Sequence, residues 1–174
     1  MDYYFYGYRN KDGSLKDFPG GAYKLIRENE AYYLPYLVNI KEKAALARAF
    51  FAHAEASRMN QHWLLTATQY EQMADEYLTL YHMDKAYNGG EIDPDTVIGE
   101  LERLIAAREK LMLLGEETRI LANRYTYLRN MTVFRQFMLD LLHYFKQEVA
   151  EGRRPEFDVT DWSRVESRAA RFLR

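Results

Sequence analysis

Apolar residues recur at helical spacing along most of the chain, and the longest such pattern spans residues 116–150. A helix that is apolar on more than one face needs neighbours on at least two sides. Two faces of this segment are apolar: Leu121, Leu128, Met138 and Phe145 on one, and Val133, Phe137, Leu141 and Tyr144 on the other. We therefore expect an all-α fold, a bundle of four to five helices in which 116–150 is the long central helix.

Four further segments have helical periodicity, namely 22–34, 39–58, 61–87 and a segment that starts near 95. Proline disfavours the helical conformation of the residue before it, so Pro35 predicts the end of the first of these helices. The segment near 95 has the strongest start signal, because Asp93 can cap the helix and Pro94 suits its first position.

The junction near Gly115 allows two interpretations. Glycine in a helix interior costs about 1 kcal/mol relative to alanine, which favours a kink or a break. The apolar phase nevertheless runs through it from Leu111 to Leu121, as in one helix of roughly 55 residues and about 80 Å. Because that length is large for a domain of this size, we favour a kink or break near 115.

The two ends of the chain differ from the middle. Residues 1–21 are rich in aromatic side chains without helical spacing and contain turn signals at 10–13 (NKDG) and 18–21 (FPGG). We interpret 1–21 as an extended N-terminal aromatic arm and 22–151 as the helical bundle. Residues 152–174 are expected to form a linker and a C-terminal helix, at about 161–173, that packs on the bundle.

Composition describes an ordinary globular chain of 174 residues, with 48% hydrophobic and 29% charged residues and a net charge of −2. That charge provides no global field for nucleic acid or an anionic membrane. The absence of cysteine excludes disulfides, thiol nucleophiles and thiolate metal sites. No signal peptide or membrane-spanning run is visible, so we expect no membrane association and favour the cytoplasm, although the compartment is left open.

Tyrosine is unusually abundant, with fifteen residues beside nine Phe and two Trp. A tyrosine ring suits half-wet surfaces, where it either seals the edge of a bundle or forms a binding platform. The candidate platform for a protein partner or a carbohydrate comprises Tyr3, Tyr4, Tyr6 and Tyr8 in the arm and Tyr32, Tyr33 and Tyr36 near Pro35.

A basic stripe on the expected last helix contains Arg164, Arg168 and Arg171. Such a stripe could bind an acidic partner or a phosphate backbone. Nearby acids, among them Asp161 and Glu166, dilute its charge. We therefore do not expect nucleic acid to be the main partner, and keep a nucleic-acid-associated helical subunit as an alternative.

Catalytic and metal-binding patterns are sparse. A di-iron bundle needs Glu-x-x-His on two helices, and only His143 has an acid, Asp140, three residues before it. The spacing of Arg48 and His53 is similar to the Arg-x4-6-His pattern of HEPN ribonucleases, although the surrounding residues do not resemble that family. The pair could supply a cation for a phosphate and a general base. The alternative function is therefore a small helical enzyme or nuclease-like subunit that uses Arg48 and His53.

Together these patterns favour a non-enzymatic helical interaction or scaffold domain. Such a domain could be an accessory part of a larger protein, for example a carbohydrate-active enzyme, or could form a homo-oligomer. We assign no catalytic residue, cofactor or metal, and expect a protein partner or self-association.

Overall fold

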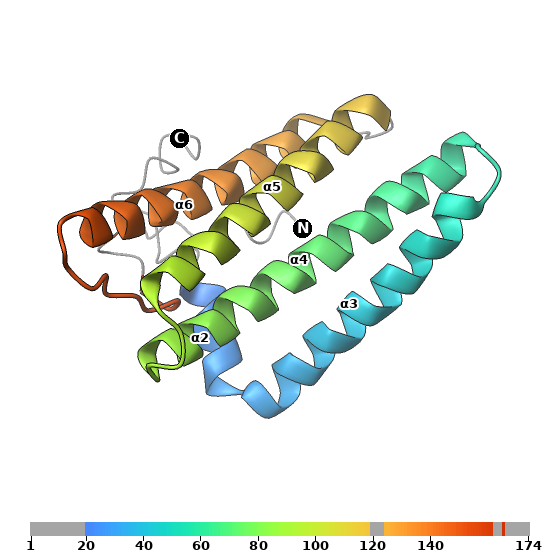
Figure 1. Ribbon diagram of the computed structural model, residues 1–174. Coiled ribbons are helices and arrows are strands. Elements are labelled where there is room, and N and C mark those ends of the chain that lie inside the picture. The colour runs from blue at the N-terminus through green and yellow to red at the C-terminus, as the bar shows by residue number, and fades with distance from the viewer. Residues whose placement is uncertain (1–19, 119–123, 162–164, 166–174) are drawn as a thin grey trace, which may run out of the picture.

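The computed structural model describes residues 20–118, 124–161 and 165, and is helical over most of them (Figure 1). The described residues contain no strand, which confirms the predicted all-α bundle. The helices are α2 (Gly20–Glu28), α3 (Glu30–His53), α4 (Arg58–Asn88), α5 (Pro94–Thr118) and α6 (Arg124–Ala150). The aromatic arm and most of the expected C-terminal helix lie outside the described residues.

Consecutive helices pack side by side, in the order α3, α4, α5 and α6 across the molecule (Figure 1). The middle of this array is α4, the longest helix at 31 residues. The segment 116–150 was expected in that place. Its residues 124–150 form α6 instead, with Val133, Phe137, Leu141 and Phe145 buried as the pattern predicts. Helix α4 therefore holds an inner position, with α3 and α5 against it, as α5 does between α4 and α6.

The break between α5 and α6 lies beyond Gly115. Helix α5 continues to Thr118 and α6 begins at Arg124. Gly115 is buried inside α5, so packing against the neighbouring helices outweighs its low helix propensity. The expected break is therefore present, after Thr118 instead of near 115, and the alternative of one continuous helix is wrong.

Pro35 does not end a helix, so the expected end near Leu34 and the expected start at Asn39 are wrong. The backbone breaks at Asn29, with φ −145° and ψ 61°, and α3 then includes Pro35 in its second turn. A proline inside a helix deprives the carbonyl four residues earlier of its donor. That carbonyl belongs to Ala31, which is exposed, so water can replace the missing donor.

One core cluster joins α2 to α6 and includes the fully buried rings of Tyr81, Tyr87 and Phe145. Tyrosines therefore serve the core as well as the surface. The ring of Tyr23 from α2 lies 5.3 Å from that of Tyr77 on α4, and the ring of Tyr87 lies 5.5 Å from that of Phe145 on α6. These contacts anchor the short α2 and close the end of the bundle.

A bidentate ion pair is buried between α4 and α5. Arg108 donates from Nε to Oε1 of Glu76 at 2.8 Å and from Nη2 to Oε2, and the side chains are only 3% and 6% exposed. The third nitrogen of Arg108 lies 3.1 Å from the sulfur of Met131 on α6, and its guanidinium lies 4.9 Å from the ring centre of Phe134. The pair therefore connects three helices.

We predict that Glu76→Ala lowers the free energy of unfolding by about 3–5 kcal/mol, because it leaves the Arg108 cation buried without its carboxylate. Urea denaturation followed by circular dichroism measures the change. The matched control is Glu100→Ala, which removes one partner of the half-exposed Arg103 and should cost less than about 1 kcal/mol. Equal losses in the two variants would contradict the prediction.

Candidate functional site

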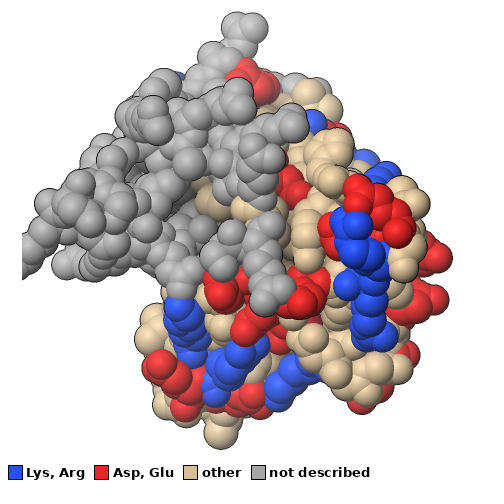
Figure 2. Space-filling view, turned by 90° about the vertical axis from the view of Figure 1, so that its left-hand side faces the viewer, with Lys and Arg blue, Asp and Glu red and all other residues tan. Residues whose placement is uncertain are grey.

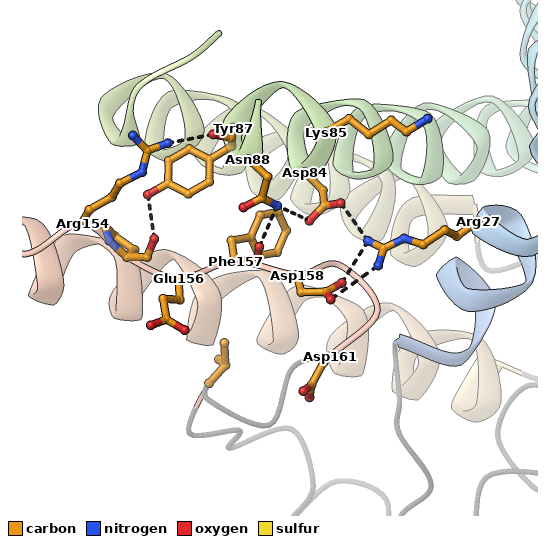
Figure 3. Close-up of a pocket in the computed structure, with 12 residues that line it drawn as sticks. Arg27, Asp84, Lys85, Tyr87, Asn88, Arg154, Glu156, Phe157, Asp158 and Asp161 are labelled. Carbon is orange, nitrogen blue, oxygen red and sulfur yellow. Dashed lines mark hydrogen bonds and ion pairs between the residues drawn. The ribbon is translucent and has the colours of Figure 1, made fainter. Parts of the chain in front are cut away.

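A network of polar side chains lies where the chain turns back after α6. Gly152 ends this helix with a φ of 72°, a left-handed conformation that favours glycine. The amide of Arg153 donates to the carbonyl of Glu148 at 2.9 Å, closing the turn. Residues 153–161, the return segment, then run back along the C-terminal end of α4 (Figure 3).

Side chains of α4 bind the backbone of the return segment at three successive points, and Figure 3 shows the first two, from Tyr87 and Asn88. The Tyr87 hydroxyl donates to the Pro155 carbonyl at 2.7 Å. The Asn88 amide donates to the Phe157 carbonyl at 2.9 Å. Asp84 accepts from the Val159 amide at 3.0 Å. Every second residue of the return segment is thus held by a side chain from the last turns of α4.

Arg27 of α2 joins the same network. Its Nη2 lies 3.0 Å from Asp84 Oδ2 and 3.0 Å from Asp158 Oδ1, and its Nη1 donates to the Thr160 hydroxyl at 3.3 Å. Burial raises the pKa of Asp84, and the Val159 amide and the Arg27 charge offset that effect only in part. Burial would also raise the pKa of Asp158, but hydrogen bonds from Thr160 and Arg27 outweigh it and lower the pKa.

A cavity of about 850 Å³ lies beside this network. Three cations reach it, from Arg27, Lys85 and Arg154, together with the acids Asp84, Glu156, Asp158 and Asp161. Each cation is already engaged: Arg27 as above, Lys85 with Glu30 at 2.6 Å, and Arg154 with the Tyr87 carbonyl at 2.7 Å. Carboxylates therefore compensate the charges of Arg27 and Lys85, whereas Arg154 is held by a neutral carbonyl, and the arrangement holds the return segment in place.

The described surface at this end of the bundle has no zone of a single charge. Figure 2 shows Lys and Arg side chains interspersed with Asp and Glu over the part drawn in colour. Such mixing produces little field for a polyanion. Among the predicted basic residues, Arg164, Arg168 and Arg171 lie outside the described residues, so the nucleic-acid alternative stays a prediction.

The predicted tyrosine platform divides into three groups. Tyr3, Tyr4, Tyr6 and Tyr8 lie outside the described residues. Tyr33 is half-buried and packs on the core. Tyr32 and Tyr36 are 61% and 52% exposed on α3, with their rings stacked at 6.2 Å between centres. Two of the predicted positions thus form one exposed aromatic surface, for which carbohydrate binding stays a prediction.

The candidate catalytic pairs do not converge. Arg48 binds Glu71 of α4 through Nε at 2.5 Å, whereas His53 is exposed at the end of α3, about 140° further round the helix. Asp140 is buried and accepts from Gln136 at 2.8 Å, whereas His143 is exposed. In the part of the chain that the structure describes, no three His, Asp or Glu residues are grouped so that they could hold a metal ion.

The structure reveals a second surface that the sequence interpretation missed. Leu46 and Phe50 of α3 are 72% and 69% exposed, on the same side of the helix as Tyr32 and Tyr36. We call Tyr32, Tyr36, Asn39, Lys43, Leu46 and Phe50 the outer α3 face; Asn39 and Lys43 are also exposed. Its signal was present as steps of 4, 3, 4, 3 and 4 residues. The neighbouring stripe of Ala44, Ala47 and Phe51 has a similar spacing and concealed it.

Comparison of the chain with protein-family models, with curated proteins and with solved structures found no match in any of the three. None of the described helices has a stretch of the length and apolar character that a membrane span requires. Function must therefore be argued from the two surfaces themselves.

We predict that Asp84→Ala lowers the free energy of unfolding by about 2 kcal/mol, because it leaves the Val159 amide without its acceptor and removes one of the two carboxylates that bind Arg27. Hydrogen exchange of the Val159 amide should accelerate in the variant. Asp95→Asn, at an exposed carboxylate of α5, is the control and should cost less than about 0.5 kcal/mol. Unchanged exchange at Val159 would show that Asp84 does not hold the return segment.

We predict a pH-dependent effect of Asp158→Asn. The folded protein lowers the pKa of Asp158, so its carboxylate adds stability above the ordinary pKa of about 4, and the gain is lost as the pH falls through the lower folded value. The gain is less than about 1 kcal/mol because the side chain is 46% exposed. Urea titrations of both proteins between pH 7 and 2.5 should converge at the acid end. A difference that grows on acidification would contradict this assignment.

Proposed function

We propose that this chain is a helical interaction domain that self-associates through the outer α3 face. The observation that supports the proposal is the alignment of four large apolar side chains on an exposed face of one helix, with exposed fractions from 52% to 72%. Single exposed apolar residues are normal on a folded protein, whereas an aligned set is typical of an interaction surface.

The position of α3 in the array supports this interpretation. A helix in a closed four-helix bundle packs against neighbours on two sides. Among the described helices, α3 lies along α4 over its length and touches α2 only at the break at Asn29 (Figure 1). It is an edge helix, and only Leu37 and Ala44 of its 24 residues are buried. Covering one exposed Leu or Phe side chain contributes about 1.5–3 kcal/mol.

The charges on this face favour a second copy of the chain over a strongly charged partner. Glu42 and Lys43 are adjacent and exposed near its middle, and neither forms an ion pair within the described residues. The central charge is therefore balanced, and a second copy in the opposite direction can offer Glu42 to Lys43 and Lys43 to Glu42. A uniformly acidic or basic partner would leave one of them facing a like charge.

The aromatic surface continues from α3 onto α4. Phe50 contacts Phe51 edge-on, with ring centres 5.1 Å apart, and Phe51 stacks on Trp63 of α4 at 6.3 Å. Trp63 is itself 46% exposed. Aromatic rings concentrate in the cores of protein interfaces, so this cluster extends the contact area at the end of the α3–α4 hairpin where the two helices are joined.

We predict that the wild-type chain shows a concentration-dependent mass in analytical ultracentrifugation and that Leu46→Glu reduces the self-association at least about tenfold, since it places a charge in an apolar contact. The control is Leu113→Glu. Leu113 is 63% exposed on α5, so the substitution changes composition and charge identically away from the proposed contact. A wild-type chain that stays monomeric to millimolar concentration would overturn the proposal.

A further inference from the structure

The outer α3 face has the spacing of a coiled-coil seam. Its positions 32, 36, 39, 43, 46 and 50 alternate steps of 4 and 3 residues, the spacing by which two helices bury a common stripe against each other. Within a single chain such a stripe is expected to face a neighbouring helix. Here all six side chains are exposed.

The order of residues along this stripe is close to symmetric. Apolar side chains occupy both ends, Tyr32 and Tyr36 at one and Leu46 and Phe50 at the other, and the polar Asn39 and Lys43 lie in the middle. A stripe with like ends and a polar centre matches itself when a second copy runs in the opposite direction. A two-fold axis through the centre then brings the same patch of both copies together.

Antiparallel pairing of two α3 helices has one register in which every position of the outer α3 face finds a counterpart. Tyr32 then faces Phe50 of the second copy, Tyr36 faces Leu46, and Asn39 faces Lys43, and each pair occurs twice about the axis. The ends are apolar layers, and the central layers join an ammonium donor to an amide carbonyl acceptor. Pro35 lies outside the span from Tyr36 to Leu46, so the inner layers are formed by uninterrupted helix.

The polar centre distinguishes this arrangement from a parallel pair. In a parallel pair each position faces its own equivalent, so Lys43 would face Lys43, and the like charges would repel. In the antiparallel pair Lys43 faces Asn39, with Glu42 of the other copy close to the axis. A polar residue at a seam position lowers affinity but selects one register and orientation.

We propose that the outer α3 face is the seam of an antiparallel, two-fold symmetric homodimer, with Tyr36 against Leu46 and Asn39 against Lys43 of the second copy. This inference rests on the proposed self-association and adds to it the orientation and the register. Two experiments test these additions, and each gives a result that differs from simple loss of association.

The first experiment uses cross-linking. The chain has no cysteine, so Tyr36→Cys and Leu46→Cys each introduce a single thiol. Mixed under mild oxidation, the two variants should form a disulfide-linked heterodimer. Each variant alone should link much more slowly, since equivalent positions lie roughly 15 Å apart along the paired helices. A Leu46→Cys variant that links efficiently with itself would indicate the parallel pair and overturn the proposal.

The second experiment exchanges charges across the seam. Lys43→Glu should weaken association at least about tenfold, because it gathers carboxylates at the axis. Adding Asn39→Lys should restore association, since the introduced lysine of each copy would then face the introduced glutamate of the other. In a parallel pair the double variant would place like charges together and show no recovery. Sedimentation of the wild type, the single variant and the double variant measures all three dissociation constants.

The outcomes separate the two levels of the proposal. If the wild type is monomeric, self-association and the antiparallel seam both fail. If Leu46→Glu disrupts a dimer but the charge exchange gives no recovery and the mixed cysteines do not link, self-association stands and the register is wrong. Recovery together with the mixed disulfide would establish the seam.

Discussion

The buried pair of Glu76 and Arg108 constrains the rest of the bundle. Two hydrogen bonds fix the rotation of α4 relative to α5, and the contacts of Arg108 with Met131 and Phe134 include α6 in the same arrangement. A buried ion pair adds little net stability over an apolar replacement, but a misaligned register would leave both charges unpaired in the core. The pair therefore acts chiefly by penalising alternative helix packings.

With this pair in place, different parts of α4 contact different neighbours. The face that holds Glu76 is committed to α5 and α6, and the C-terminal turns are committed to the return segment through Asp84, Tyr87 and Asn88. The remaining face contacts α3 through paired charges such as Lys41 with Asp75 and Arg48 with Glu71. Because these polar contacts serve the joint, Tyr32, Tyr36 and Phe50 of α3 point outward and produce the exposed face.

The sequence predicted the helices well and their junctions less well. Periodicity identified the buried positions of α6, because a stripe that repeats every three or four residues reports burial directly. Pro35 misled because the cost of a proline depends on whether water reaches the freed carbonyl. The break expected near Gly115 comes after Thr118, because packing overrode the low helix propensity of glycine. The return-segment network joins residues such as Arg27 and Asp158, 131 positions apart, and local patterns cannot indicate such contacts. The sequence contains the heptad spacing of the outer α3 face, but only the structure shows that no described helix covers it.

The ion pair between Arg27 and Asp158 also has a consequence for the order in which the molecule folds. The α3–α4 and α5–α6 hairpins join neighbouring stretches of chain and close short loops, whereas this contact closes almost the whole described chain at once. Loop-closure entropy makes such a contact unfavourable until the intervening helices have shortened the distance. Docking of the return segment onto α2 and α4 is therefore a late event in folding, and it occurs on a surface that the four long helices have already assembled.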